Sequence, residues 1–419
     1  MDRSFYPDGN LPLFYLAKVR SSPVQNGFDF LFCSVVPQYS LVSGLFWAPV
    51  TASGPHGYPS PLDSHPFYDL LFLSGFQICR IAPHPLSLVG EFCNCTKLFS
   101  VDSESLRMIQ KERIKVLNQK EMKKGAYVLY WMQISQRTEY NHALEYAIIR
   151  ANELKQPLLV FFGITDHFPE ANERHYAFML EGLQEVKQSL GKRGIRVILL
   201  HQPLDRGAVQ IAKKASLVIV DRGYLSIQRQ WRENVANRID CPFIQVESDV
   251  VVPIEEVSNK EEYAAATIRS KMHRKLDHFM VPLKQRDPDI DSLSLKVESF
   301  RIDKMDQALS KLRIDRSVKK VPFFRGGMKE ASKHLEVFLE GKLDRFPELR
   351  NDPTLDYLSQ MSPYLHFGQI SPLWIALKVK QTQSTGIEAF LEELIIRREL
   401  SMNFVFYNEK YDSYESIPE

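Results

Sequence analysis

Short apolar runs alternate with amphipathic segments between residues 127 and 246, and this rhythm is the strongest constraint on the fold. Runs that are apolar at nearly every position are typical of strands buried on both faces, and a helix between successive strands makes a parallel crossover. The pattern therefore predicts an α/β fold with a doubly wound parallel sheet. The expected strands are 127–132, 158–164, 197–200, 217–220 and 243–246, and the expected helices lie near 138–155, 172–190, 205–214 and 227–238.

The loop after the first expected strand is a natural ligand position, because such a sheet binds ligands at the carboxyl ends of its strands. Residues 131–137 contain no G-x-G-x-x-G and no Walker glycines, so we expect no pyrophosphate cradle of the dehydrogenase or P-loop kind. The loop offers polar amides and Arg137 instead. These groups either frame a planar ligand or cap the sheet, and we favour capping.

Composition divides the chain near residue 100. Residues 1–100 hold 11 charged residues and the other 319 hold 93, yet the first segment holds 11 of the 24 prolines and 11 of the 26 phenylalanines. Pro and Gly interrupt its apolar stretches, so no helical or strand period is sustained. We expect residues 1–102 to be an irregular leader: a small domain, a disordered extension or a stretch outside the mature protein. The segment is too apolar for ordinary disorder, and we favour one with no chemistry of its own.

Metal, membrane and secretory signals are not predicted. The pair Cys93-x-Cys95 lacks the two-residue spacing of most zinc or redox pairs, and no metal site is expected. The longest apolar runs, such as 158–164, are far shorter than a bilayer span. The N-terminus has no basic stretch leading into an apolar core, so we expect no signal peptide. The net charge is only +2, so a polyanion would have to meet a local basic patch.

The βα rhythm stops beyond residue 252. Residues 103–120 and 261–269 read as helices, and the second runs into a basic stretch at 270–275. Residues 256–350 carry 21 basic and 16 acidic residues, whereas 351–419 carry five and ten. For the basic stretch we favour a solvated helix face over a phosphate track. Prolines and polar runs make 280–330 a connecting segment.

Two stretches near the end carry more specific patterns. In 358–372, Ser359 and Ser362 stand three apart directly before Pro363, where a helix can begin. Hydroxyls and free backbone N–H groups at a helix start suit a phosphate. A second Ser-Pro pair at 371–372 opens the next helix. In 390–400, Glu393 and Arg397 lie four apart on one helix face, where they can form an ion pair.

Together with two further motifs, these stretches resemble the DNA photolyase/cryptochrome family, in particular class II cyclobutane pyrimidine dimer photolyases. The resemblance covers roughly residues 104–419, as judged from the order of the motifs. The four motifs are Y-W-M-x-x-x-Q-R-x-x-x-N-x-A-L at 130–144, K-x-E-Y-A-A-x-T-I-R at 260–269, S-P-Y-L-H-F-G-x-I-S-P at 362–372 and R-R-E-L-x-x-N-F at 397–404.

The resemblance implies two domains and a flavin. Residues 103–252 would form a Rossmann-like antenna domain, 253–330 a linker with helices, and 331–419 an all-α FAD-binding domain. Light-excited FADH⁻ would donate an electron to a cyclobutane pyrimidine dimer in UV-damaged DNA, so that the enzyme is a lyase whose flavin carries the redox chemistry. The damaged pair would leave the base stack to reach the flavin. Some members hold a second chromophore, such as a deazaflavin, in the antenna domain.

The family also implies the setting in which the chain acts. We expect a monomer with damaged DNA as its partner, without a membrane association. It would be cytoplasmic, at the nucleoid, in a prokaryote and nuclear in a eukaryote, and it would not be secreted.

The site residues follow from the family motifs position by position. No catalytic side chain is assigned. Phe346 stands where members commonly have a tyrosine, so a hydroxyl able to bind phosphate is gone. Ile396 stands at the position of the lesion-stacking tryptophan of class I relatives. The resemblance implies FAD phosphate contacts at Ser359, Gln360, Met361 and Ser362. It places Glu393 and Arg397 beside the flavin and the DNA cavity, with Phe390 at the start of that helix. It also implies a DNA contact at Arg398.

The family continues into further helices past the position of Glu419. We therefore expect a C-terminally truncated photolyase with an incomplete helical domain, which would bind flavin weakly or not at all. Two alternatives stay open at this point. One is a cryptochrome-like photoreceptor that binds FAD and signals without repair, and the other is an inactive remnant whose helical half does not fold.

Overall fold

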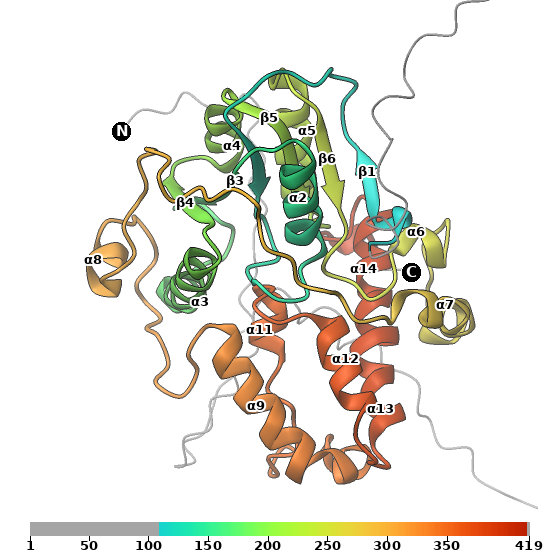
Figure 1. Ribbon diagram of the computed structural model, residues 1–419. Coiled ribbons are helices and arrows are strands. Elements are labelled where there is room, and N and C mark those ends of the chain that lie inside the picture. The colour runs from blue at the N-terminus through green and yellow to red at the C-terminus, as the bar shows by residue number, and fades with distance from the viewer. Residues whose placement is uncertain (1–108, 417–419) are drawn as a thin grey trace, which may run out of the picture. The chain divides into compact units, whose positions relative to one another are not determined.

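The computed structural model describes residues 109–416 (Figure 1). The leader expected at 1–102 lies outside this range, as does the start of the helix expected at 103–120. Within residues 109–416, no helix combines the length and the apolar character that crossing a membrane requires.

A six-stranded sheet organises the first half of this range, with the strand order β1-β6-β5-β2-β3-β4. Neighbouring strands from β2 to β6 pair in parallel, whereas β1 (Ile114–Val116) pairs antiparallel with β6. The parallel sheet predicted from the apolar runs is confirmed, and the antiparallel edge makes it a mixed sheet. The parallel strands are β2 (Tyr127–Trp131), β3 (Leu158–Ile164), β4 (Arg196–His201), β5 (Ala215–Asp221) and β6 (Phe243–Val246).

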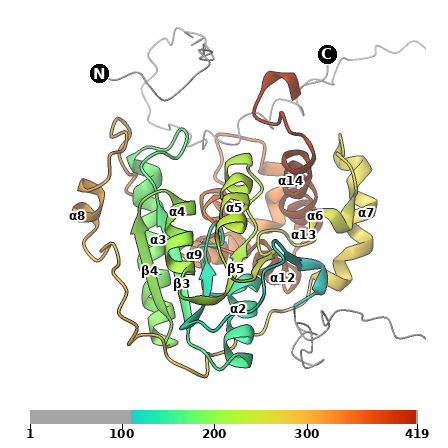
Figure 2. The same cartoon turned by 90° about the horizontal axis from the view of Figure 1, so that it is seen from above.

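Four helices cover the two faces of the sheet, one after each of β2 to β5. One apolar cluster packs α2 and α3 against the sheet, and a second packs α4 and α5 against it. Seen from above, α2 and α5 lie on opposite sides of β5 (Figure 2). Because both faces are covered, the strands are buried on each side, which explains their nearly continuous apolar runs. The helices are α2 (His142–Glu153), α3 (Glu173–Lys192), α4 (Leu204–Ala212) and α5 (Ser226–Arg238).

The helix expected at 103–120 is wrong for the part that the structure describes. A single 3₁₀ turn, η3 (Lys111–Arg113), leads directly into strand β1. The guanidinium of Arg113 is buried and donates to the carbonyl oxygens of Val250 and Val251 at 3.2 and 2.7 Å. Because Arg113 is fixed there, residues 114–116 lie along the free edge of β6 and pair with it. This tertiary pairing outweighs the helical spacing of the apolar residues.

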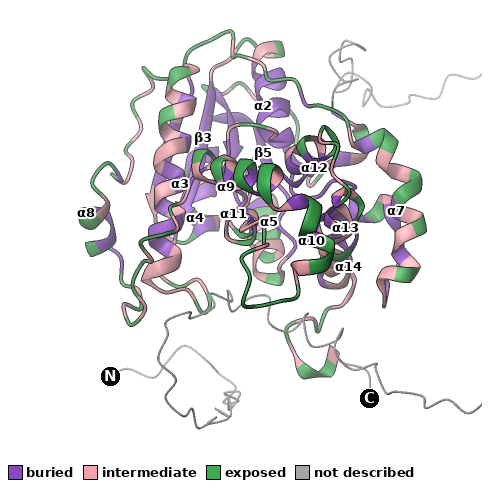
Figure 3. Cartoon of the chain, turned by 90° about the horizontal axis from the view of Figure 1, so that it is seen from below, coloured by how far each residue is buried: buried purple, intermediate pink, exposed green. Residues whose placement is uncertain are grey.

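The chain beyond the sheet is helical, with a long connecting segment between α7 and α9 that contains only the short helix α8. Helix α7 starts at Ala265 and not at 261, because the backbone of residues 260–262 is bound by the contacts described below. Figure 3 shows buried strands, whereas α7 and α8 keep exposed faces. The helices are α6 (Ile254–Val257), α7 (Ala265–Phe279), α8 (Met305–Ser310), α9 (Met328–Gly341), α10 (Phe346–Leu349), α11 (Ser362–His366), α12 (Pro372–Lys380), α13 (Ile387–Leu391) and α14 (Arg398–Tyr407), with a π-helical segment η5 (Glu392–Arg397) and 3₁₀ turns η4 (Leu343–Arg345) and η6 (Tyr414–Ser416).

The amide side chain of Asn403 joins two segments that are 141 residues apart. Its oxygen accepts the backbone N–H of Glu262 at 2.7 Å, and its nitrogen donates to the carbonyl oxygen of Lys260 at 3.1 Å. Asn403 is fully buried on α14. Two of the motifs that carry the family resemblance, at 260–269 and 397–404, are therefore held together by one side chain.

Replacing Asn403 with Ala should lower the free energy of unfolding by about 1 to 3 kcal/mol, because it leaves the buried N–H of Glu262 unpaired and removes the partner of the part-buried carbonyl of Lys260. Urea denaturation followed by circular dichroism would measure the loss. Asn237→Ala, at an exposed position on α5, is the matched control and should change little. If both substitutions change the free energy of unfolding equally, the contacts of Asn403 do not stabilise the fold.

Candidate functional site

The loop after β2 is closed around a carboxylate at the switch point of the sheet. Asp221, the last residue of β5, accepts the backbone N–H groups of Gln133, Ile134 and Ser135 at 2.6 to 2.7 Å. The hydroxyl of Tyr130 donates to the same carboxylate at 3.2 Å. Successive N–H groups of this kind form an anion-binding concavity in other proteins, and here the protein supplies the anion itself.

Arg137 caps the sheet and does not frame an open ligand site, in agreement with the interpretation favoured from the sequence. Its buried guanidinium donates to the carbonyl oxygens of Ser248, at 2.5 Å, and Gly368, at 3.0 Å. Gly368 has φ +61°, and a Cβ there would lie 1.9 Å from the carbonyl oxygen of Ile134. The close approach of the helical half to this loop therefore requires a glycine.

The turn at residues 359–362 presents two hydroxyls around a buried anchor. Met361 is buried in the core of the helical half, whereas Ser359 is half-buried and Ser362 is exposed. Gln360 takes the left-handed conformation with φ +59°, which turns the chain sharply between the two serines. The Ser359 hydroxyl accepts the N–H of Met361 at a long 3.4 Å, and the Ser362 hydroxyl has no partner among residues 109–416.

Phe346 and Phe390 belong to the aromatic core of the helical half. Their ring centroids are 5.4 Å apart, and both pack against Phe338 of α9 at 5.6 and 4.8 Å. All three rings are buried. The ring of Phe346 thus packs without a hydroxyl, and these two residues position α10 and α13 next to one another.

Glu393 lies between two arginines beside this aromatic core. The guanidinium of Arg350, at the end of α10, contacts its carboxylate, and Arg397 Nε lies 3.0 Å from the same carboxylate oxygen. The Glu393–Arg397 ion pair expected from the sequence spacing is therefore present. Neither side chain is sealed off from solvent, with 34% of Glu393 and 46% of Arg397 exposed. The segment is π-helical, a form that is often found at functional sites.

A second carboxylate extends this row of charges to α7. Glu392 accepts from Arg269 in a bidentate pair at 2.6 and 3.0 Å, and this hydrogen bonding lowers the pKa of Glu392. The row therefore contains two carboxylates and three arginines, which leaves one net positive charge on a partly exposed surface. It links α10, η5 and α7.

Arg398 and Glu399 turn the other way, toward the α/β half. Arg398 donates to the carboxylate of Asp249 at 2.8 Å and to its carbonyl oxygen at 3.0 Å. The carboxylate of Glu399 accepts the N–H groups of Val251 and Val252 at 2.5 and 3.2 Å. Complete burial raises the pKa of Glu399 to about 8, although those N–H groups oppose the shift.

Comparisons with known proteins agree with the resemblance seen in the motifs. Residues 128–289 match the family model described as DNA photolyase. The deoxyribodipyrimidine photo-lyase of Methanothermobacter thermautotrophicus is 47% identical over 313 residues, a match that covers 74% of this chain and 69% of that protein. The chain belongs to the DNA photolyase family.

More distant photolyases share the fold. The deoxyribodipyrimidine photo-lyase of Potorous tridactylus is 35% identical over 316 residues, which cover 73% of this chain but only 58% of that protein. An archaeal photolyase from Sulfolobus tokodaii, whose structure holds two FAD molecules, superposes with a TM-score of 0.53 at 19% identity, and the match covers 67% of this chain and 60% of that chain. The matched region is thus a little over two thirds of the first relative and about three fifths of the others.

Two residues of the candidate site were missed from the sequence. Arg350 carries the partner charge of Glu393, and Asp221 fills the concavity after β2. Arg350 stands four residues after Phe346, so a short helix places both side chains on one face, and its guanidinium lies over the ring at 5.5 Å. This four-residue spacing could have predicted that Arg350 lies beside Phe346. The role of Asp221 was visible only as a single acidic residue at the end of an apolar run.

The raised pKa of Glu399 predicts how stability depends on pH. Between pH 4.5 and about 8, the folded protein keeps a proton on Glu399 that the unfolded chain releases, so the free energy of unfolding should fall as pH rises through this window. Glu399→Gln removes the titration and should show a shallower fall between pH 5 and 8, while being less stable overall.

Thermal or urea unfolding at several pH values would measure both slopes. The exposed Glu409→Gln variant is the control and should keep the wild-type slope. If Glu399→Gln has the same slope as the wild type, Glu399 is ionised in the folded state at pH 7.

Proposed function

We propose that this chain is a light-driven deoxyribodipyrimidine photo-lyase of the class II type, which uses FAD to split cyclobutane pyrimidine dimers in DNA. The observation that carries the proposal is the 47% identity to the photo-lyase of M. thermautotrophicus over 313 residues. The four class II-like motifs support it, because the contacts at Gly368 and Asn403 join them in pairs.

The residues of the turn fit the phosphates of FAD. The hydroxyls of Ser359 and Ser362 are accessible and are not used in strong contacts within the described chain, and the positive φ of Gln360 opens the backbone between them. Hydroxyl and N–H donors are the groups that bind phosphate oxygens without a metal. Met361 would anchor the turn through its buried side chain. When bound and reduced, the flavin supplies the electron that opens the cyclobutane ring.

Glu393 and Arg397 would face the damaged strand. Both are partly exposed, and they offer a carboxylate acceptor and a guanidinium donor side by side. Pyrimidine bases present N–H and C=O groups on their edges, so this pair can hold a base that has left the stack. Arg350 and Arg397 hold the carboxylate of Glu393 in place. Arg398 would act as a positioning residue, because its guanidinium is bound to Asp249.

A flavin-binding experiment tests the turn. The double substitution of Ser359 and Ser362 to Ala should weaken FAD binding by about tenfold or more, since two hydrogen bonds to charged oxygens are lost. Titration of the full chain with FAD, followed by flavin fluorescence, gives the affinity. Ser294→Ala, at an exposed position in the connecting segment, should bind FAD as the wild type does. If the double variant binds FAD with the affinity of the wild type, the turn does not bind the FAD phosphates.

Repair itself is tested with dimer-containing DNA and the FAD-loaded chain. Illuminated protein should lower the dimer count and the dark sample should not. Arg397→Ala should reduce the repair rate by about tenfold through weaker DNA binding, whereas the exposed Arg313→Ala should not. Equal dimer counts in light and dark, with flavin bound, would indicate a photoreceptor without repair. A chain that binds no flavin would be an inactive remnant.

A further inference from the structure

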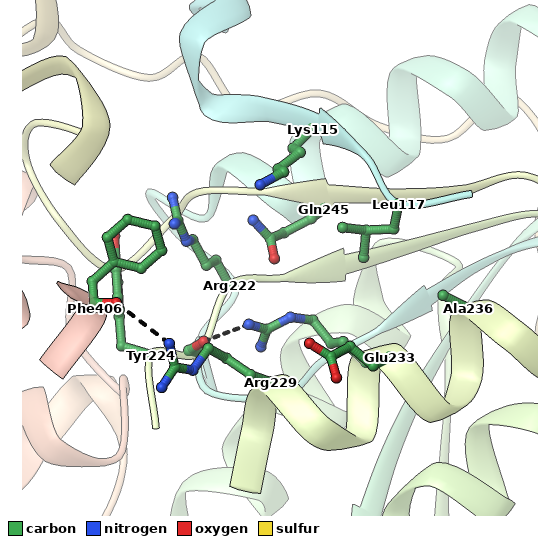
Figure 4. Close-up of a pocket in the computed structure, with 11 residues that line it drawn as sticks. Lys115, Leu117, Arg222, Tyr224, Arg229, Glu233, Ala236, Gln245 and Phe406 are labelled. Carbon is green, nitrogen blue, oxygen red and sulfur yellow. Dashed lines mark hydrogen bonds between the residues drawn. The ribbon is translucent and has the colours of Figure 1, made fainter. Parts of the chain in front are cut away.

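A small cavity lies beside α5, at the edge of the sheet formed by β1 and β6. None of its lining residues belongs to the turn at 359–362 or to the row of charges around Glu393. Its volume is about 170 Å³. Figure 4 shows Lys115 and Gln245 on the sheet side and Arg229 and Glu233 on the side of α5. Phe406 of α14 also lines it.

Gln245 is the most unusual residue of this cavity. It lies two residues after Phe243 on β6, so it faces the same side of the sheet, which is otherwise packed with apolar side chains under α4 and α5. Only 5% of Gln245 is exposed, yet its side-chain amide makes no hydrogen bond within residues 109–416. Neither amide atom is closed off, so the amide opens into the cavity without a partner in the described chain and is available to a ligand there.

Lys115 adds a positive charge next to this amide. It is paired directly with Gln245 across the antiparallel β1–β6 ladder, so the two side chains project from the same face. Lys115 is exposed and makes no ion pair with the described part of the chain.

The arginines of the cavity differ in how far their charge is already neutralised. Arg222 is fully engaged, because Glu255 binds it in a bidentate pair at 2.6 and 2.8 Å. Arg229 donates only to the carbonyl oxygen of Phe406, at a long 3.4 Å. Arg232 donates to the amide oxygen of Gln133 and to the carbonyl oxygen of Gly223, at 2.8 and 2.7 Å, and the carboxylates of Asp221 and Glu247 act on its charge only from a distance.

The charge of the cavity is therefore positive. Four basic side chains, those of Lys115, Arg222, Arg229 and Arg232, line it against one acidic side chain, that of Glu233. In the described chain Lys115, Arg229 and Arg232 make no direct ion pair, although the charge of Glu255 acts on Lys115 from farther away.

We propose that this cavity binds the terminal phosphate of a small molecule. Lys115 and Arg229 contact the phosphate oxygens, and the Gln245 amide donates to the oxygen that reaches deepest. The volume is smaller than the roughly 300 to 1,000 Å³ of clefts for drug-sized ligands, so a phosphate or pyrophosphate group fits and a large ring system does not.

A terminal phosphate is favoured over a phosphate of the DNA backbone. An internal phosphodiester carries a sugar on each side and cannot reach a side chain that is 95% buried. The site thus differs in ligand and in place from the proposed repair site, and it does not depend on flavin.

Calorimetric titration of the full chain with pyrophosphate and with inorganic phosphate tests this site. Lys115→Met and Gln245→Leu should each weaken pyrophosphate binding by about tenfold, because each removes one hydrogen bond to a charged oxygen. Lys124→Met, at an exposed lysine in the loop before β2, should bind as the wild type does. Duplex DNA with 5′-hydroxyl ends should not displace pyrophosphate.

Thermal unfolding with and without pyrophosphate is a second measurement. It separates a ligand-binding role of Gln245 from a purely structural one. Without phosphate, Gln245→Leu should melt at a temperature no lower than that of the wild type, because the amide that it removes makes no hydrogen bond within residues 109–416. With pyrophosphate, the wild type should gain stability and the variant should not. No saturable binding to the wild type, or equal binding by Lys115→Met and the wild type, would overturn the proposal. Displacement of pyrophosphate by the duplex with 5′-hydroxyl ends would show that the site binds the DNA backbone.

Discussion

The segment 249–252, which follows the sheet, is held almost entirely by side chains from other parts of the molecule. Glu399 accepts the N–H groups of Val251 and Val252, while Arg113 donates to the carbonyl oxygens of Val250 and Val251. Buried backbone groups need partners, and here an acid and an arginine replace a neighbouring strand. The segment thereby becomes the fixed point to which α14 and the start of β1 are both attached.

This attachment also sets the direction of the candidate site. Because η5 runs straight into α14, the contacts of Arg398, Glu399 and Asn403 decide which way Glu393 and Arg397 project. The side chains at the start of α14 make buried contacts with the segment after the sheet, whereas the charges of η5 pair with one another and with Arg269 and Arg350 and stay partly exposed. Buried contacts and partly exposed charges thus lie on successive turns of one continuous helix.

Much of the fold could be predicted because burial on two faces leaves a direct mark in the sequence. The five parallel strands and the helices between them follow from apolar runs such as 158–164, and the ion pair of Glu393 with Arg397 follows from their helical spacing. Residues near 109–120 were mistaken for a helix, because an edge strand with few apolar residues has no clear period of its own. Its identity depends on a partner 130 residues away in the chain.

The sequence by itself determined the parallel sheet, the photolyase-like motifs and the acidic–arginine helix, because each depends on residues that are close together along the chain. Only the tertiary structure decided that Asp221 fills the concavity after β2, that Arg350 joins Glu393, and that Gln245 lies unpaired beside a cavity. These contacts join residues 43 to 88 positions apart, or depend on burial at the sheet edge. A linear pattern records the type of each residue, but the partner of a buried polar group is set by the packing of distant elements.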